Sequence, residues 1–156
     1  MGMAGTPLIV VARQEEAAHL DGRYPVLVTG IGEVAAAVAV TRALATGDRP
    51  SEIINLGTAG ALRAGLAGTQ EIKSVIQHDF DSPAIEAATL RAEGLAQRAD
   101  LVDMEGYAVA AAATAFGVPV RIIKHVSDHA DNGAFKSWQA TVNECARALA
   151  VFLHVS

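Results

Sequence analysis

Cysteine, positive charge and long apolar runs are all scarce in this chain of 156 residues. The single cysteine, Cys145, excludes an internal disulfide. The 12 Lys and Arg residues are dispersed and are outnumbered by 17 Asp and Glu residues. The formal charge of -5 therefore gives no electrostatic reason to expect nucleic acid or an anionic membrane as a partner. No basic segment precedes an apolar stretch near the start, so we expect a cytoplasmic protein.

A transmembrane helix is also not expected, although 51% of the residues are hydrophobic. The uncharged run at 106–120 is shorter than the roughly 20 apolar residues that a spanning helix needs, and it contains glycine and proline. Alanine and valine supply much of the apolar content. No internal repeat, low-complexity tract or linker interrupts the chain, and we therefore expect a single domain over residues 1–156.

What the chain does contain is an alternation of predicted strands and helices. Apolar runs predict strands at 8–12, 24–30, 52–57, 72–80 and 120–126. Helical patterns, caps and stops predict a short helix near 14–17 and longer helices at 33–47, 82–99, 103–117 and from 133 onward. This alternation indicates an α/β fold.

Two carboxylates are directed to one edge of the predicted sheet. Asp103 is expected to cap a helix whose first turn holds Glu105. The strand at 120–126 then brings Ser127 and Asp128 to its carboxyl end, where ligands bind in open α/β sheets. Taken singly, each acid also fits a purely local role, bonding nearby backbone N–H groups or complementing the helix dipole.

Two glycine-rich segments are candidates for ligand-binding turns. The sequence G-I-G-E-V-A from Gly30 matches the dinucleotide fingerprint G-x-G-x-x-A. The acid that should end the next strand is missing, because Glu52 begins that strand and Asp48 precedes it, which disfavours a nicotinamide or flavin cofactor. The segment GTAGAL at 57–62 is predicted as a small-residue turn around Thr58, either a tight connection or a nest for a ligand oxygen.

Other polar and aromatic residues are interpreted structurally. His78, Asp79 and Asp81 lack the further ligands that a metal site needs, so no metal is expected. In the last helix Phe135 and Trp138 belong to an apolar stripe that steps by three or four, which favours core packing over stacking on a ligand base.

Four blocks of the sequence, in order, resemble the nucleoside phosphorylase and nucleosidase superfamily, in particular the 5′-methylthioadenosine/S-adenosylhomocysteine nucleosidases. The blocks are ARQEEAAHL, TGIGEVAAAVA, IINLGTAGAL and VDMEGYAVAAAATAFGVPVRIIKHVSDHAD. The resemblance implies a three-layer sandwich with a central, mostly parallel twisted sheet flanked by helices. It also implies a purine nucleoside as substrate, no cofactor, and a homo-oligomer that is a dimer or higher.

The resemblance assigns a role to each residue of the expected site. Glu16 positions and deprotonates the attacking water, and Asp128 acts as general acid toward the purine. Ser127 orients Asp128. Glu105 accepts hydrogen bonds from the ribose hydroxyls, and Met104 packs on the sugar. Substrate binding is further assigned to the small-residue segment formed by Thr58, Ala59 and Gly60.

The cationic residues expected near the site bear on whether the nucleophile is water or phosphate. A phosphorylase must bind a phosphate dianion, generally with arginine, and in the related bacterial phosphorylases an arginine precedes the glycine segment. The corresponding residue here is the uncharged Asn55. Arg13 and Lys124 keep a cationic site open as an alternative. We therefore expect a nucleosidase that uses water, with phosphorolysis as the alternative.

The resemblance is interrupted between Asp81 and Ser82. Family members carry a further segment at this junction, with a strand and a loop that closes over the purine. Its absence here has two explanations. A shortened protein would be a third alternative, a nucleoside-binding homologue without turnover, whereas a sequence that omits residues between these positions would belong to a working enzyme. The retention of Glu16, Glu105 and Asp128 together favours the enzyme.

Overall fold

The computed structural model describes residues 5–77, 85–86, 99–130 and 134–155. Its strands are β1 (Leu8–Val11), β2 (Val26–Val28), β3 (Ile53–Ala61), β4 (Thr69–Ile72), β5 (Ser74–Val75), β6 (Ile85–Glu86), β7 (Leu101–Val102) and β8 (Val120–Asp128). The helices of this part of the chain are the short 3-10 helix η1 (Gln14–Ala17) and the α-helices α1 (Glu33–Thr46), α3 (Gly106–Ala115) and α4 (Ala134–Val155).

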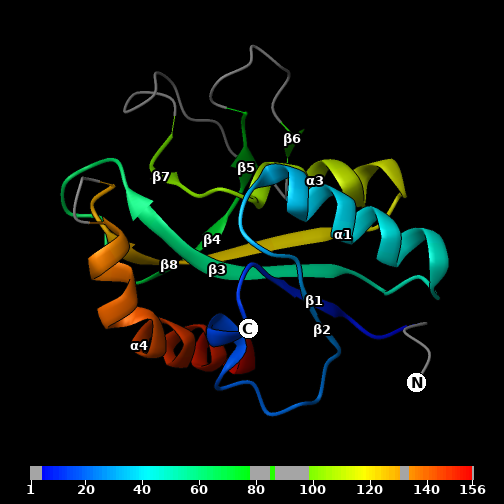
Figure 1. Cartoon of the computed structure of the whole chain (residues 1–156), viewed down its shortest axis with the longest axis horizontal. Coiled ribbons are helices and arrows are strands. Elements are labelled where there is room, and N and C mark those ends of the chain that lie inside the picture. Colours follow the sequence, from blue (N-terminus) through cyan, green and yellow to red (C-terminus); the bar gives the residue numbers. More distant parts are fainter. Residues whose placement is uncertain (1–4, 78–84, 87–98, 131–133, 156) are drawn as a thin grey trace.

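A mostly parallel sheet forms the middle layer, in the strand order β2-β1-β3-β8-β4. β1 pairs in parallel with β2 and β3, and β3 pairs in parallel with β8. β4 joins β8 and β7 joins β3 in antiparallel fashion. Helices α1 and α3 cover one face, and α4 with η1 covers the other (Figure 1). The predicted α/β fold with a flanked central sheet is confirmed.

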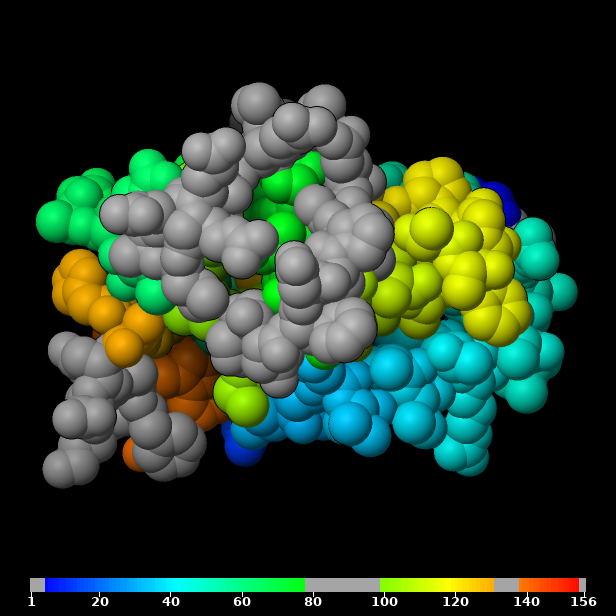
Figure 2. Space-filling model, turned by 90° about the horizontal axis from the view of Figure 1, so that it is seen from above, coloured from blue at the N-terminus to red at the C-terminus, as the bar shows by residue number. Residues whose placement is uncertain are grey.

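Each face of the sheet has its own hydrophobic core, because successive side chains of a strand point to opposite faces. In β1, Leu8 and Val10 pack under α1 and α3, whereas Ile9 and Val11 pack against α4. Figure 2 shows α1 and α3 side by side on one surface of the molecule. The uninterrupted apolar run of β1 thus reflects burial from both sides.

The predicted ends of the helices are confirmed. α1 ends before Gly47, whose N–H donates to the Ala43 carbonyl. α3 ends before Gly117, which adopts φ 65° at little cost because it lacks a Cβ. β8 then begins just after Pro119. Across the described ranges, no helix is long and apolar enough to cross a membrane.

Three predicted elements are corrected at their boundaries. The strand expected at 24–30 is reduced to β2, an edge strand with two exposed valines. The strand expected at 72–80 begins earlier, as β4, because 69–72 pairs along the free edge of β8. The helix expected at 82–99 is wrong at Ile85–Glu86, which pair with β5 as β6. The remainder of 78–84 and 87–98 lies outside the described residues.

The turn expected at 57–62 is also wrong, because β3 continues to Ala61. Its end is paired on both sides, with Gly60 opposite Asp128 of β8 and Val102 of β7. A Cβ at Gly60 would lie 2.8 Å from Asp128 Oδ1 and 2.8 Å from the Cβ of Ala130. Glycine therefore serves here to let two chain segments approach closely, rather than to turn the chain.

The close approach at Gly60 predicts a stability loss for Gly60→Ala. The added methyl group must displace Asp128 or Ala130, and overpacking of this kind costs about 1–3 kcal/mol. Urea denaturation of the purified variant measures the loss. Ala64→Ser, at an exposed loop position after β3, is the control and should change the free energy of unfolding by less than about 0.5 kcal/mol. Equal stabilities for the two variants would contradict the packing argument.

Candidate active site

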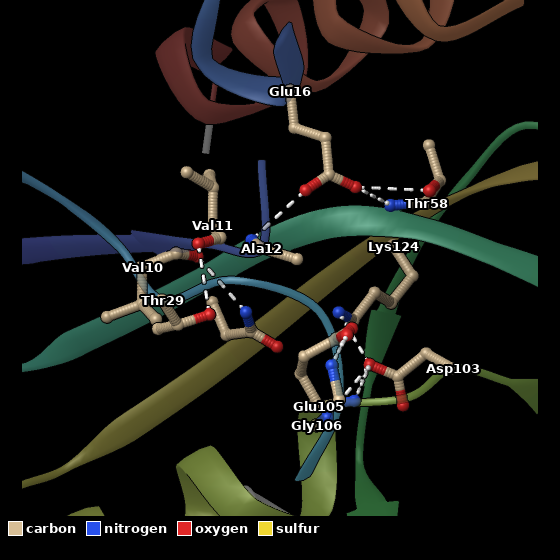
Figure 3. A network of polar contacts seen from close by, with 12 residues as sticks. Val10, Val11, Ala12, Glu16, Thr29, Thr58, Asp103, Glu105, Gly106 and Lys124 are labelled. Atoms are coloured by element: carbon tan, nitrogen blue, oxygen red, sulfur yellow. Dashed lines mark hydrogen bonds and ion pairs between the residues drawn. The ribbon is translucent and has the colours of Figure 1, made fainter. Parts of the chain in front are cut away.

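Glu16 is a buried carboxylate in η1, directly after β1, with 4% of its surface exposed. Its Oε2 accepts the backbone N–H groups of Ala12 and Arg13, both at 3.1 Å. Its Oε1 accepts the backbone N–H of Thr58 at 2.9 Å and the Thr58 hydroxyl at 3.1 Å (Figure 3). Four donors, two from the segment after β1 and two from Thr58 within β3, therefore hold this carboxylate in one orientation.

Lys124 is the buried cation of the site. It lies in β8, and its Nζ is 2.8 Å from Asp103 Oδ2. Burial lowers the pKa of Lys124, but Asp103 above all, with Glu16 and Glu105, outweighs burial, and the pKa is raised. A Cβ at Gly57 would lie 3.1 Å from Lys124 Nζ and 3.2 Å from Glu16 Oε1. The ammonium and the Glu16 carboxylate therefore flank the same point of β3.

Glu105 bridges the starts of two helices. It precedes α3, where Asp103 Oδ2 accepts the N–H of Gly106 at 2.8 Å. The predicted helix start at Asp103 is nevertheless wrong, because α3 begins at Gly106 and Glu105 occupies the N-cap position. Glu105 itself stands just outside the first turn, and its Oε1 accepts the N–H of Gly32 at the start of α1, at 2.7 Å. Burial raises the pKa of Glu105, against the opposing effects of the Gly32 N–H and Lys124.

This contact changes the interpretation of the G-I-G-E-V-A segment. The N–H of Gly32 is one of the groups that a pyrophosphate would need at the start of α1. It is already engaged by Glu105 from a position 73 residues further along the chain. The glycine turn therefore holds a carboxylate of the protein itself, in agreement with the weak match to the dinucleotide fingerprint.

Ser127 and Asp128 form a second polar group at the end of β8. The Ser127 hydroxyl donates to Asp128 Oδ2 at 2.6 Å, and the N–H of Ala130 donates to Oδ1 at 2.8 Å. The contact by which Ser127 would orient Asp128 is therefore present. Through Gly60 this group adjoins the end of β3, three residues beyond Gly57.

The two polar groups are joined by the end of β3. Thr58 contacts Glu16, the Ser127 hydroxyl oxygen lies 3.5 Å from the Ala59 carbonyl oxygen, and Gly60 adjoins Asp128. Met104 lies 59% exposed in the segment before α3 and outside both groups. The structure thus brings the expected residues to one edge of the sheet, with Met104 at the surface.

A cavity of about 420 Å³ adjoins the network around Lys124. Its polar wall includes Asp103, Glu105 and Lys124, and its apolar wall comes largely from β4, β5 and β7 and the segments next to them. Such a volume suits a small organic molecule. Glu16 and Asp128 are not among the residues that line it, so the cavity extends from the Glu105 side of the site.

Two side chains make contacts that the sequence analysis does not predict. Lys124, which the sequence analysis names only as an alternative cationic site, is a buried charge with partners, and its position within the apolar strand VRIIKHV is the signal for this. The apolar stripe of the last helix predicts core packing for Trp138. That prediction holds for Cys145 and Leu149, which are buried. The Trp138 indole N–H instead donates to the Thr58 hydroxyl at 2.9 Å.

Asn55 lies inside the sheet rather than at its edge. It is 1% exposed, and its Nδ2 donates to the Val10 carbonyl at 3.0 Å. Within the described residues, its Oδ1 has no hydrogen-bond partner. Asn55, which stands where the related phosphorylases have an arginine, is therefore held by the backbone of β1.

The sequence model of the phosphorylase superfamily matches residues 2–93 and 80–154 of the chain. The chain belongs to the phosphorylase superfamily. The two matched segments of this superfamily member overlap at residues 80–93, a range that contains the Asp81–Ser82 junction. A comparison with curated proteins finds no match.

Solved structures of superfamily nucleosidases share the fold. The Streptococcus pneumoniae MTA/SAH nucleosidase in complex with 8-aminoadenine is 23% identical, with a TM-score of 0.78 over 95% of this chain and 96% of that chain. A Helicobacter pylori MTAN mutant with 5′-methylthioadenosine in its active site is 21% identical, with a TM-score of 0.80 over 99% and 98%. The native futalosine hydrolase of the same organism is 22% identical, with a TM-score of 0.78 over 97% of each chain.

The buried ion pair predicts a large effect of Lys124→Met. The substitution leaves Asp103, Glu105 and Glu16 without their cation, and breaking a buried pair in this way costs about 3–5 kcal/mol. Urea denaturation near neutral pH measures the loss. Arg63→Gln is the matched control, because it breaks the exposed pair of Arg63 with Asp100 and should cost at most about 1 kcal/mol. A similarly small loss for Lys124→Met would contradict the assigned role.

The raised pKa of Glu105 predicts a pH-dependent stability. Its carboxyl binds the proton more tightly in the folded chain than in the unfolded chain. The stabilisation from this group is therefore fully present below the ordinary value of 4.5 and is lost as pH rises through the folded-state pKa. Glu105→Gln removes this loss, so its Tm relative to wild type should be higher at about pH 8 than at about pH 4.

Glu71→Gln is the control with the opposite sign. The hydrogen bond from Arg121 lowers the pKa of Glu71, so its stabilisation is present above 4.5 and is lost as pH falls. The Tm of Glu71→Gln relative to wild type should therefore decrease with rising pH. Parallel pH trends for the two variants would rule out the assigned direction for Glu105.

Proposed function

We propose that this member of the phosphorylase superfamily hydrolyses the N-glycosidic bond of a purine nucleoside, with water as nucleophile. The observation that carries the proposal is the Glu16 carboxylate, buried and held by four donors beside Lys124, which is ion-paired with Asp103. A fixed carboxylate of this kind suits the positioning and deprotonation of water.

The charges around Glu16 support water over phosphate. Lys124 is already bound by Asp103, and its other charged neighbours are Glu16 and Glu105. A phosphate dianion next to this ammonium would also face three carboxylates, so repulsion would offset the attraction. The Arg13 side chain is bonded to Glu15 at 2.7 Å and is directed to the surface. Neither cation is placed to bind a free dianion.

The reaction can be written with each residue in one role. As the water oxygen bonds to C1′ of the ribose, Glu16 accepts a water proton and the bond from C1′ to the purine nitrogen breaks. The electron pair of that bond moves into the purine, which receives a proton from Asp128. Glu105 binds the ribose hydroxyls more strongly as the ring becomes cationic. Ser127 orients Asp128, and Met104 packs on the sugar.

Within this proposal the substrate is an adenine-type nucleoside such as 5′-methylthioadenosine or S-adenosylhomocysteine. The solved relatives that carry 8-aminoadenine and 5′-methylthioadenosine support this class. The Asp81–Ser82 junction favours a second candidate, a nucleoside-binding homologue without turnover, because the segment that closes over the purine in the family is missing there.

The test is release of free adenine from 5′-methylthioadenosine in phosphate-free buffer, followed by chromatography. Glu16→Gln and Asp128→Asn should each lower kcat by about 10²- to 10⁴-fold, the usual contribution of general acid–base catalysis. Glu52→Gln and Asp48→Asn are the matched controls and should retain wild-type activity, because both residues lie at the opposite end of β3 or in the loop before it.

Two other results would change the assignment. Base release that depends strictly on added phosphate would identify a phosphorylase. A nucleoside that raises Tm without any base release would identify the binding homologue.

A further inference from the structure

Trp138, the only tryptophan of the chain, is attached to the site through Thr58. Its indole N–H donates to the Thr58 hydroxyl oxygen at 2.9 Å, from a position 80 residues further along the chain. The guanidinium carbon of Arg13 lies 5.4 Å from the centroid of the indole ring, a cation–π distance. The ring is thus held at its edge by β3 and over its face by the segment that leads into η1.

The direction of this hydrogen-bond chain is determined by chemistry. An indole nitrogen can only donate, so the Thr58 oxygen must accept. The single Thr58 hydroxyl proton is then directed away from the indole, and Glu16 Oε1 lies 3.1 Å from the hydroxyl oxygen. The indole N–H of Trp138 therefore donates to Thr58, and the Thr58 hydroxyl donates to Glu16.

Thr58 is the adjustable donor among the four groups that hold Glu16. The other three are backbone N–H groups of Ala12, Arg13 and Thr58, whose directions are set by the chain path. A hydroxyl hydrogen can rotate about its C–O bond and is directed by its own partners. The Thr58 hydroxyl is therefore the one group donating to Glu16 whose direction the backbone does not fix, and the indole N–H of Trp138 sets that direction.

We propose that Trp138 is a positioning residue for Glu16, acting through the Thr58 hydroxyl. The role rests on the proposed nucleosidase activity, in which Glu16 holds the attacking water. Through this contact, one end of α4 orients the carboxylate that holds water in the proposed reaction. α4 lies on the opposite face of the sheet from α1 and α3. Trp138 acts on Glu16 without itself touching the reacting atoms.

A double-mutant cycle tests the proposal. Trp138→Phe keeps an aromatic ring but removes the N–H, and it should lower kcat by about 3- to 10-fold, the usual worth of one neutral hydrogen bond. KM should stay within about twofold, since the donor chain leads to Glu16 rather than to the substrate. Thr58→Val should lower kcat at least as much. Adding Trp138→Phe to Thr58→Val should then cause no further loss, because the chain is already interrupted.

Rescue and control variants separate positioning from packing. Thr58→Ser keeps the hydroxyl and should retain far more activity than Thr58→Val. Asn143→Ser removes the 2.8 Å contact between α4 and His19, which also joins α4 to the segment after η1 but does not involve Thr58. It should leave kcat within about twofold of wild type. Independent losses that multiply in the double variant, or a change confined to KM, would overturn the proposal.

A spectroscopic readout distinguishes failure of this inference from failure of the proposed function. With one tryptophan, the chain gives a single indole signal in a ¹⁵N–¹H spectrum. Thr58→Val should move this signal and Thr58→Ser should leave it near its original position. Glu16→Gln should move it when Thr58 is present but not in the Thr58→Val background. If the indole signal does not move in Thr58→Val, the inference is overturned, whether or not the protein releases free base. A signal that follows these rules in a protein without base release supports the contact chain and refutes the nucleosidase.

Discussion

The parallel pairing of β3 with β8 is the constraint on which the candidate site depends. Its register places Gly57 opposite Lys124 and Gly60 opposite Asp128, with one irregularity between Ala59 and Gly60. A slip of one residue would turn Lys124 to the other face of the sheet, because side chains alternate along a strand. The two glycines let Lys124 and Asp128 of β8 come close to the backbone of β3. The register of β3 with β8 therefore determines the geometry of the candidate site.

The buried charges of the site depend on one another in the same way. Lys124 remains charged inside the protein because Asp103 lies 2.8 Å away, and Glu16 and Glu105 add to its stabilisation. The cluster holds more negative than positive charge. Such a field favours a sugar that becomes cationic during bond cleavage and disfavours a phosphate dianion. In the proposed hydrolysis, the contacts that stabilise the fold would thus also favour water over phosphate as nucleophile.

Local sequence signals predicted the elements well where local chemistry decides them. The apolar run of β1, the end of α1 at Gly47 and the end of α3 before Gly117 all follow from burial, helix termination and the conformational freedom of glycine. The same local signals predicted a turn at 57–62, because small residues are typical of turns, and that prediction is wrong. Strands on both sides of β3 supply hydrogen bonds that extend it to Ala61, and no local pattern reports such partners.

By itself, the sequence determined the order of the elements, their alternation, and the acids and hydroxyls that stand at strand and helix ends. Resemblance to a family then separated Glu16 from its neighbour Glu15. The tertiary structure alone decided which donors meet which acceptors: Gly32 with Glu105, 73 residues apart, and Trp138 with Thr58, 80 residues apart. The reason is physical. Periodicity and capping report contacts within a few turns of the chain, whereas these pairs exist only because the sheet register and the packing of α1, α3 and α4 bring their elements together.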